Sequence, residues 1–242
     1  MDRKLIVALV AELFGTFFFQ LFGGTEQTAA YNGLLLTVCI IFTAKPSGGH
    51  LNPAVSVGLC ITGAIKASHA ALYCSVQVVG AIIASLLSAG VDLNSADVPH
   101  GLSSWADDNA GPGCRAALPT PAYGAVFVLE LAGTFLLVST ICAAAVAKPG
   151  FGDAAPFAIG LSIFVSVGAV GSITGGFFNP ARFLGPAIVY GCNLQVFWLY
   201  LLAQFIGGAL GGAMYRFVFA TPTTEPLLVK SAPGTELASQ RQ

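Results

Sequence analysis

Two Asn-Pro-Ala sequences are the residues of this chain whose types and spacing point most directly to a chemical role. The first copy consists of Asn52, Pro53 and Ala54, and the second consists of Asn179, Pro180 and Ala181. Each copy follows a glycine-rich segment, and Asn followed by Pro is typical of the first positions of an α-helix. The apolar run after each Pro is about ten residues long, whereas a helix that crosses a bilayer core needs roughly 20. The sequence therefore predicts two helices that are too short to span a membrane.

The remaining polar side chains form no catalytic or metal-binding pattern. His50, His69 and His100 are scattered along the sequence, and no nucleophile lies beside a base and an acid. The cysteines lack the paired spacing of zinc sites. We therefore expect no enzymatic activity, no metal and no cofactor. Glu12 and Glu130 are different, because each lies inside an apolar segment, where a carboxylate is costly unless partners satisfy it.

The elements that position these residues are membrane helices. Of 242 residues, 55% are hydrophobic and only 9% are charged, whereas soluble domains carry about 25% charged residues. The formal net charge of −1 argues against a nucleic-acid partner. Six apolar segments are predicted to span the membrane, at about residues 5–23, 33–45, 69–90, 122–147, 156–174 and 194–219.

Charge predicts the orientation of these spans. Positively charged loops face the cytoplasm, and the basic residues that fall on one face are Arg3, Lys4, Lys66, Lys148, Arg216 and Lys230. Both termini are therefore expected to be cytoplasmic.

The segments outside the membrane include a long outer loop at residues 91–121 and a polar tail at residues 220–242, which we expect to be disordered in the cytoplasm. Cys114 and Cys192 both fall on the outer face, where a disulfide and two free thiols are both open options.

The two halves of the chain repeat one another. The sequence around Glu12 reappears around Glu130, and Gln77 follows Asn52 at the same spacing as Gln204 follows Asn179. Each half holds three spans, so the second half must enter the membrane from the opposite side, as in inverted repeats. The two short helices then meet by their N-termini in mid-membrane, where irregular backbone is tolerated if it lines a wet cavity. The sequence predicts an all-α membrane protein with a pore, built as one channel domain over residues 1–219 with repeats at about 5–90 and 122–219.

These features resemble the aquaporins, or major intrinsic proteins. The resemblance covers about residues 5–219 and rests on the paired Asn-Pro-Ala sequences, the Glu in spans one and four, and Arg182 after the second copy. It implies a homotetramer in the bilayer with one pore per subunit, and passive flow of water or small neutral solutes. Two facing helix N-termini bring positive partial charge to the pore centre. Donors from Asn52 and Asn179 would hold a water by its oxygen there, which interrupts a proton wire.

The resemblance also assigns roles to residues outside the Asn-Pro-Ala sequences. Glu12 and Glu130 would accept hydrogen bonds from the re-entrant backbone, with Gln77 and Gln204 as further buried structural residues. The alternative is that the two carboxylates relay protons in a secondary transporter. An apolar collar around the asparagines would consist of Phe19, Leu137, Val55 and Phe178.

The resemblance places a selectivity filter at Asn32, Val167, Gly176 and Arg182. Water-selective members have an aromatic residue and a His where this chain has Asn32 and Val167, so a wider constriction is expected. A slip of one residue would put Tyr31 in place of Asn32. This set is most similar to the plant tonoplast intrinsic branch. We expect passage of water with ammonia, urea, hydrogen peroxide or glycerol, the alternative being strict water selectivity.

Overall fold

The computed structural model describes residues 2–25, 28–92, 111–114 and 123–220, and the regular secondary structure in these ranges is all helical. Six long helices are apolar enough to cross a membrane. They are α1 (Arg3–Thr25), α2 (Ala29–Ser47), α4 (Ala67–Asp92), α6 (Tyr123–Ile141), α7 (Ala155–Thr174) and α9 (Phe197–Met214). Two short helices, α3 (Pro53–Thr62) and α8 (Pro180–Tyr190), begin at the Pro of each Asn-Pro-Ala sequence. The predicted fold class is confirmed.

Three short turns extend the long helices. A π-helical turn, η1 (Cys142–Val146), continues α6, and a second one, η3 (Tyr215–Phe219), continues α9. A 3₁₀ turn, η2 (Gly152–Ala154), leads into α7. The expected tail and most of the expected outer loop lie outside the described residues.

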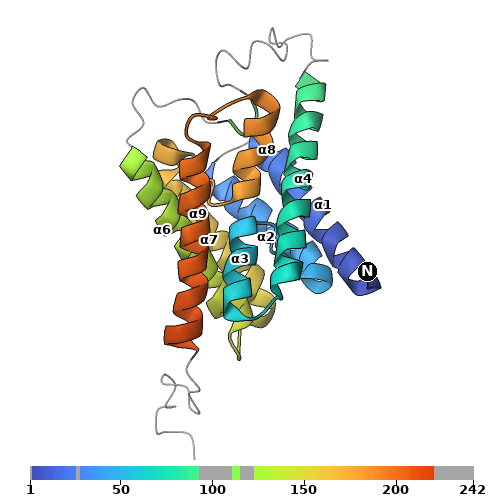
Figure 1. Ribbon diagram of the computed structural model, residues 1–242, viewed down its shortest axis with the longest axis vertical. Helices are drawn as coiled ribbons and strands as arrows, with labels where there is room; N and C mark the ends of the chain where they lie inside the picture. Colours follow the sequence, from blue (N-terminus) through green and yellow to red (C-terminus); the bar gives the residue numbers. More distant parts are fainter. Residues whose placement is uncertain (1, 26–27, 93–110, 115–122, 221–242) are drawn as a thin grey trace, which may run out of the picture.

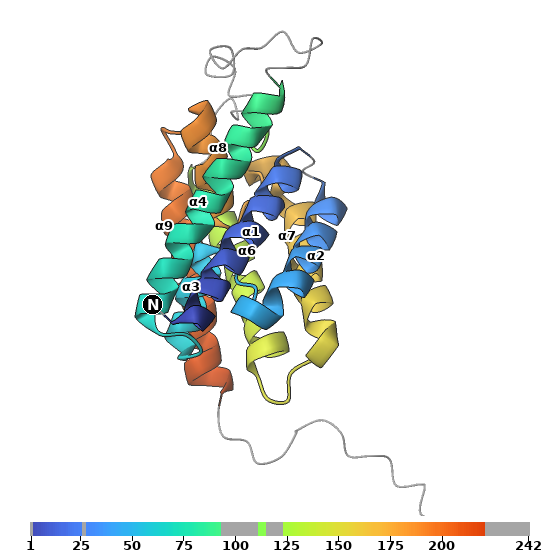
Figure 2. The same cartoon turned by 90° about the vertical axis from the view of Figure 1, so that its right-hand side faces the viewer.

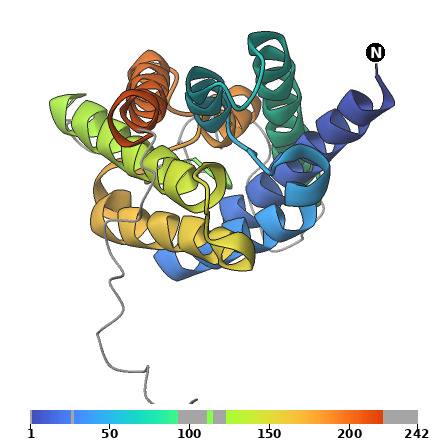
Figure 3. The same ribbon diagram turned by 90° about the horizontal axis from the view of Figure 1, so that it is seen from below.

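The arrangement of the helices follows the sequence repeat. The pairing of α1 with α4 corresponds to that of α6 with α9, and α2 packs against α7 across the two halves. The two short helices lie in different halves of the molecule along its long axis. Figure 1 shows α3 in the lower half and α8 in the upper half. The first turn of α1 and the end of α9 lie toward the same end of the molecule, as the turned view in Figure 2 also shows. Figure 3 shows α1 and α4 on one side and α6 and α9 on the other.

Glycines allow these helices to approach closely. A Cβ on Gly33 of α2 would lie 2.7 Å from the carbonyl oxygen of Gly160 on α7. A Cβ on Gly58 of α3 would lie 2.7 Å from the carbonyl oxygen of Gly208 on α9, and one on Gly185 of α8 would lie 2.8 Å from that of Ala81 on α4. Because no side chain fits at these crossings, the two short helices are held tightly against the long ones.

The outer surface is apolar and the polar residues are inside. On α2, Leu34 is 66% exposed and Val38 is 59% exposed, while the polar Glu12, Gln77, Glu130 and Gln204 are fully buried. A water-soluble protein shows the opposite pattern. This distribution suits helices whose outer faces contact lipid and whose inner faces line a polar path.

Candidate functional site: a pore between two half-length helices

The two asparagines act as N-caps, as the sequence predicts. Asn52 and Asn179 have extended backbone conformations, and each side-chain oxygen accepts a hydrogen bond at 2.9 Å from a backbone N–H, that of Ala54 or Ala181. The oxygen of Asn179 also accepts from the backbone N–H of Arg182 at 3.4 Å. These bonds satisfy N–H groups that a helix start leaves without partners. The orientation of each amide is thereby fixed.

The amide nitrogens then connect the two halves. Asn52 Nδ2 donates to the carbonyl oxygen of Phe178 at 2.8 Å, and Asn179 Nδ2 donates to that of Leu51 at 2.8 Å. Leu51 and Phe178 have positive φ, 52° and 48°, which turns their carbonyls toward the opposite half. Each NH₂ group carries two hydrogens. One is used in this exchange, and the second is available to a molecule between the asparagines.

The carboxylate of Glu12 holds the first re-entrant segment. It accepts hydrogen bonds from the hydroxyl of Ser47 at 2.6 Å, the backbone N–H groups of His50 at 2.9 Å and Leu51 at 2.7 Å, and Gln77 Nε2 at 2.7 Å. The side chain is fully buried. These four donors satisfy the oxygens of a carboxylate that lies in an apolar setting.

Glu130 repeats this arrangement in the second half. It accepts from the hydroxyl of Thr174 at 2.6 Å, the backbone N–H groups of Phe177 at 3.1 Å and Phe178 at 2.9 Å, and Gln204 Nε2 at 2.8 Å. It too is fully buried. The two carboxylates therefore support the irregular segments that carry the asparagines.

A cavity of about 900 Å³ leads to the asparagine pair from one end of the molecule. Its mouth includes Lys45, Lys148 and Asp153, and both Asn52 and Asn179 contribute to its lining. The four residues predicted as an apolar collar also line it, namely Phe19, Val55, Leu137 and Phe178. The structure thus brings the collar residues and the asparagines to one place.

Arg182 lies beyond this cavity, close to the C-terminal end of α1. Its Nη2 donates to the carbonyl oxygen of Gly23 at 2.8 Å, and its guanidinium carbon lies 4.4 Å from the ring centroid of Phe19. A Cβ on Gly23 would lie 3.2 Å from Asn32 Oδ1, so Asn32 adjoins the same carbonyl region. Asn32 is 2% exposed whereas Tyr31 is 37% exposed. It is therefore Asn32, and not its neighbour, that lies inside the molecule near Arg182.

Val167 and Gly176 form a second adjoining pair. Gly176 has a φ of 61°, and a Cβ there would lie 3.2 Å from Val167 Cγ2. Val167 is 6% exposed. The four predicted filter residues are absent from the lining of the large cavity.

Comparison with known proteins agrees with this geometry. The family described as Major intrinsic protein matches residues 2–215. This chain belongs to the major intrinsic protein family. Members of this family are channels, so the expectation that the chain is no enzyme is confirmed.

Among the relatives of this major intrinsic protein are plant tonoplast-type sequences. It is 37% identical to "Probable aquaporin TIP2-2" of Arabidopsis thaliana, over 84% of this chain and 77% of that protein. It is 38% identical to "Aquaporin TIP2-3" of the same plant, over 81% of this chain and 73% of that protein. The predicted resemblance, including its tonoplast branch, is confirmed. The fold matches the X-ray structure of the aquaglyceroporin from Plasmodium falciparum with a TM-score of 0.73 at 23% identity, over 89% of this chain and 97% of that one.

The internal repeat of this major intrinsic protein shows how its two ends differ. At the offset that relates Asn52 to Asn179, Arg182 corresponds to Val55, Gly176 to Gly49, Val167 to Ile40, and Asn32 to Ile159. These four counterparts all line the large cavity. The same positions therefore carry a cation and an amide at one end of the pore and aliphatic side chains at the other. The spacing of the repeat in the sequence is sufficient to give this correspondence.

Two tyrosines with no role predicted from the sequence also support the re-entrant segments. The hydroxyl of Tyr73 donates to the carbonyl oxygen of Ser47 at 2.9 Å, and that of Tyr200 donates to the carbonyl oxygen of Thr174 at 2.7 Å. They occupy corresponding positions of the repeat, and that correspondence is the signal that could have identified them.

Proposed function

We propose that this protein is a passive channel for water that also passes small neutral solutes, such as ammonia, urea, hydrogen peroxide or glycerol, and excludes protons and ions. The observation that carries this proposal is the reciprocal exchange between Asn52 and Asn179 at the inner end of the cavity. It leaves one amide hydrogen on each residue for a passing molecule.

Proton exclusion follows from the direction of these donors. The N-termini of α3 and α8 face one another and place positive partial charge at the pore centre. A water molecule there accepts from both asparagines through its oxygen, so its own hydrogens point away along the pore. Neighbouring waters on the two sides are then oriented in opposite directions. No continuous chain of donors can carry a proton across.

The proposed filter consists of Asn32, Val167, Gly176 and Arg182. Arg182 supplies a fixed positive charge that repels cations, and its Nε, which lacks a hydrogen-bond partner among the described residues, is a donor for a solute oxygen. The small side chains of Val167 and Asn32 leave room for a solute larger than water. Strict water selectivity is the alternative, and the filter variants described below distinguish the two.

We further propose that residues 1–219 form one channel domain with cytoplasmic termini, and that four copies assemble in the bilayer. The basic residues Lys45, Lys66 and Lys148 support this orientation, because they fall in segments at the end of the molecule where α1 begins. The homotetramer rests on membership of the family. Transport driven by Glu12 or Glu130 is disfavoured, since each carboxylate is fully buried and occupied by four donors.

Stopped-flow light scattering on proteoliposomes tests the proposed function. Vesicles that contain the protein should shrink in hyperosmotic sucrose well ahead of empty vesicles, with no dependence on sodium or pH gradients. Water flux no faster than in empty vesicles would refute a channel.

The same vesicles test the filter through uptake of glycerol, urea and ammonia. Asn32→Phe and Val167→His restore bulk at the proposed constriction and should lower uptake of these solutes more than they lower water flux. If no solute enters vesicles with the unmodified protein while water does, the strict water channel is the correct alternative.

A further inference from the structure

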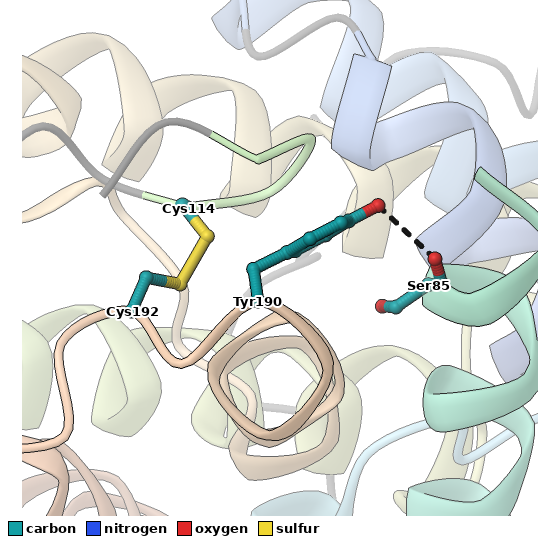
Figure 4. The surroundings of a disulfide bond; sticks show 4 residues. All are labelled: Ser85, Cys114, Tyr190 and Cys192. Carbon is teal, nitrogen blue, oxygen red and sulfur yellow. Dashed lines mark hydrogen bonds between the residues drawn. A yellow bond between two sulfur atoms is a disulfide. The ribbon is translucent and has the colours of Figure 1, made fainter. Parts of the chain in front are cut away.

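A disulfide fixes part of the outer loop to the end of α8. Cys114 and Cys192 are bonded, with their Cα atoms 6.0 Å apart, although they are 78 residues apart in sequence. The bond joins the turn Gly111–Cys114 to the segment directly after α8, as Figure 4 shows. Cys114, Cys192, Tyr190 and Ala89 form a small buried apolar cluster around it. The turn is therefore held at the end of the pore that carries Arg182.

The turn Gly111–Cys114 packs against the side chain of Tyr190. Gly111 packs so closely on the Tyr190 ring that a Cβ at this position would overlap it. The Tyr190 hydroxyl donates to the carbonyl oxygen of Ser85 on α4 at 3.0 Å (Figure 4). The turn is closed by a hydrogen bond at 2.8 Å from the Cys114 N–H to the Gly111 carbonyl oxygen. One side of the turn is thus anchored to α8 and, through Tyr190, to α4.

The other side of the turn faces the last residues of α1. Gly113 has a φ of 85°, and a Cβ there would lie 2.7 Å from Gln20 Nε2 and 3.2 Å from Pro186 Cγ. A Cβ on Gly24 would lie 3.5 Å from the carbonyl oxygen of Pro112. The turn therefore fills the space between α8 and the outer end of α1.

This end of α1 carries the acceptor that holds Arg182. Gly23 accepts from Arg182 Nη2 at 2.8 Å, and α1 ends at Thr25. The last carbonyls of a helix have no partner within the helix, and its last turn frays when nothing packs on it. The two consecutive glycines, Gly23 and Gly24, weaken the helix further. Gly23 can hold Arg182 in one place only if the end of α1 is itself supported.

We propose that the disulfide-anchored turn Gly111–Cys114 is a positioning element for Arg182, acting through Gly24 and the Gly23 carbonyl. The inference rests on the proposed function, because it concerns the selectivity of the same pore. When the disulfide opens, the turn separates from α8, the end of α1 frays, and Arg182 loses its fixed acceptor. The constriction then admits larger neutral solutes more readily, while the asparagine pair and the water path remain intact.

A phosphine added to the folded protein is the reagent chosen to open this disulfide. Tris(carboxyethyl)phosphine attacks one sulfur and breaks the S–S bond, and hydrolysis of the resulting thiophosphonium releases the second thiol. The phosphorus is oxidised to the phosphine oxide with oxygen from one water, whose two hydrogens end on Cys114 and Cys192. Diamide reverses the change by taking two electrons and two protons from the thiols and becoming the hydrazine.

The test measures glycerol and water permeability of the same proteoliposomes before and after the phosphine is present on both sides of the membrane. Thiol labelling verifies that Cys114 and Cys192 are reduced. Reduction should raise the ratio of glycerol to water permeability by about threefold, a modest change in barrier, and diamide should restore the ratio. Hydrogen exchange in a peptide that covers residues 19–25 should rise in parallel, because the end of α1 loses its support.

Two variants serve as controls. Cys60→Ser removes a free cysteine on α3 and should respond to the phosphine as the unmodified protein does. The double variant Cys114→Ser, Cys192→Ser should have the raised ratio from the start and no response. If that variant does not fold, reduction of the unmodified protein still decides the question.

An unchanged permeability ratio after verified reduction would overturn the positioning role, and so would unchanged exchange in residues 19–25. Failure of the proposed function is a separate outcome, because unmodified vesicles would then conduct no water before any reductant is added.

Discussion

At the scale of single residues, the buried carboxylates stabilise the irregular segments by accepting hydrogen bonds. Glu12 and Glu130 each accept two backbone N–H groups that no helix or strand could satisfy, in addition to a hydroxyl and a Gln amide. A buried backbone donor without a partner costs about 1–3 kcal/mol. The carboxylates are thus needed because glycine-rich backbone lies at membrane depth.

Replacing one of these carboxylates tests this role. In Glu130→Gln, the new NH₂ group faces donors instead of accepting from them, so we expect the free energy of unfolding to fall by about 2–4 kcal/mol. Denaturant unfolding in detergent micelles measures the change. Ser75→Ala is the matched control, because this exposed hydroxyl bonds only within its own helix. Equal stability of Glu130→Gln and the control would contradict the structural role.

Arg182 gives the second prediction at this scale. The variant Arg182→Val installs the side chain that occupies the corresponding position, Val55, in the first half. It removes the fixed cation and the bond to Gly23, so we expect glycerol and urea permeability to rise about tenfold while water flux changes little. Uptake assays in proteoliposomes measure both. Solute uptake that stays at the unmodified level would show that the constriction lies elsewhere.

At the scale of elements, close helix crossings hold the short helices and connect the halves. The crossing of α2 with α7 has glycine on both sides, and Thr37 donates at this point to the Gly33 carbonyl oxygen at 3.0 Å and to that of Pro156 at 3.3 Å. A helix pair in lipid gains most of its stability from such close packing, since burial from water contributes little there.

A methyl group added at the crossing of α2 with α7 should therefore destabilise the folded protein. The Cβ of Gly160→Ala would overlap the Thr37 hydroxyl and the Gly33 carbonyl oxygen, and we expect a loss of about 1–3 kcal/mol in unfolding free energy. Gly124→Ala is the control, because nothing lies within 4 Å of a Cβ at that position. The unfolding free energy of Gly124→Ala should stay unchanged or rise by about 0.5–1 kcal/mol, because Ala has the better helix propensity. Similar losses in both variants would mean that packing at the crossing is unimportant.

At the scale of the whole molecule, the ends of the bundle differ in chemistry. The end where α1 begins and α9 finishes carries Lys45 and Lys148 at the cavity mouth, and the opposite end carries the disulfide. Basic loops face the cytoplasm, and disulfides persist in oxidising compartments. Both features independently favour the same orientation.

This orientation predicts the result of a sidedness experiment. In sealed vesicles of known orientation, an impermeant phosphine should reduce Cys114 and Cys192 only from the side opposite to a C-terminal epitope tag. Mass spectrometry of labelled peptides reports the reduction, and antibody binding without detergent reports the tag. Reduction and antibody binding from the same side would refute cytoplasmic termini.

The sequence by itself determined the fold class, the two half-length helices and the residues at their starts. Composition is decisive for membrane helices, and Asn followed by Pro defines a helix start through local chemistry that needs no tertiary contact. The repeat added the inversion, since three spans per half leave no other arrangement.

Only the tertiary structure decided which side chains meet. Arg182 and Gly23 are 159 residues apart in sequence, and the spacing within each helix does not specify how the helices rotate against one another. That rotation buries Asn32 and exposes Tyr31. Tertiary packing outside the helices brings Cys114 to Cys192, a pair for which the sequence left both a disulfide and free thiols open. Local backbone preference acts over a few residues, whereas the environment around Arg182 depends on how the two halves pack against one another.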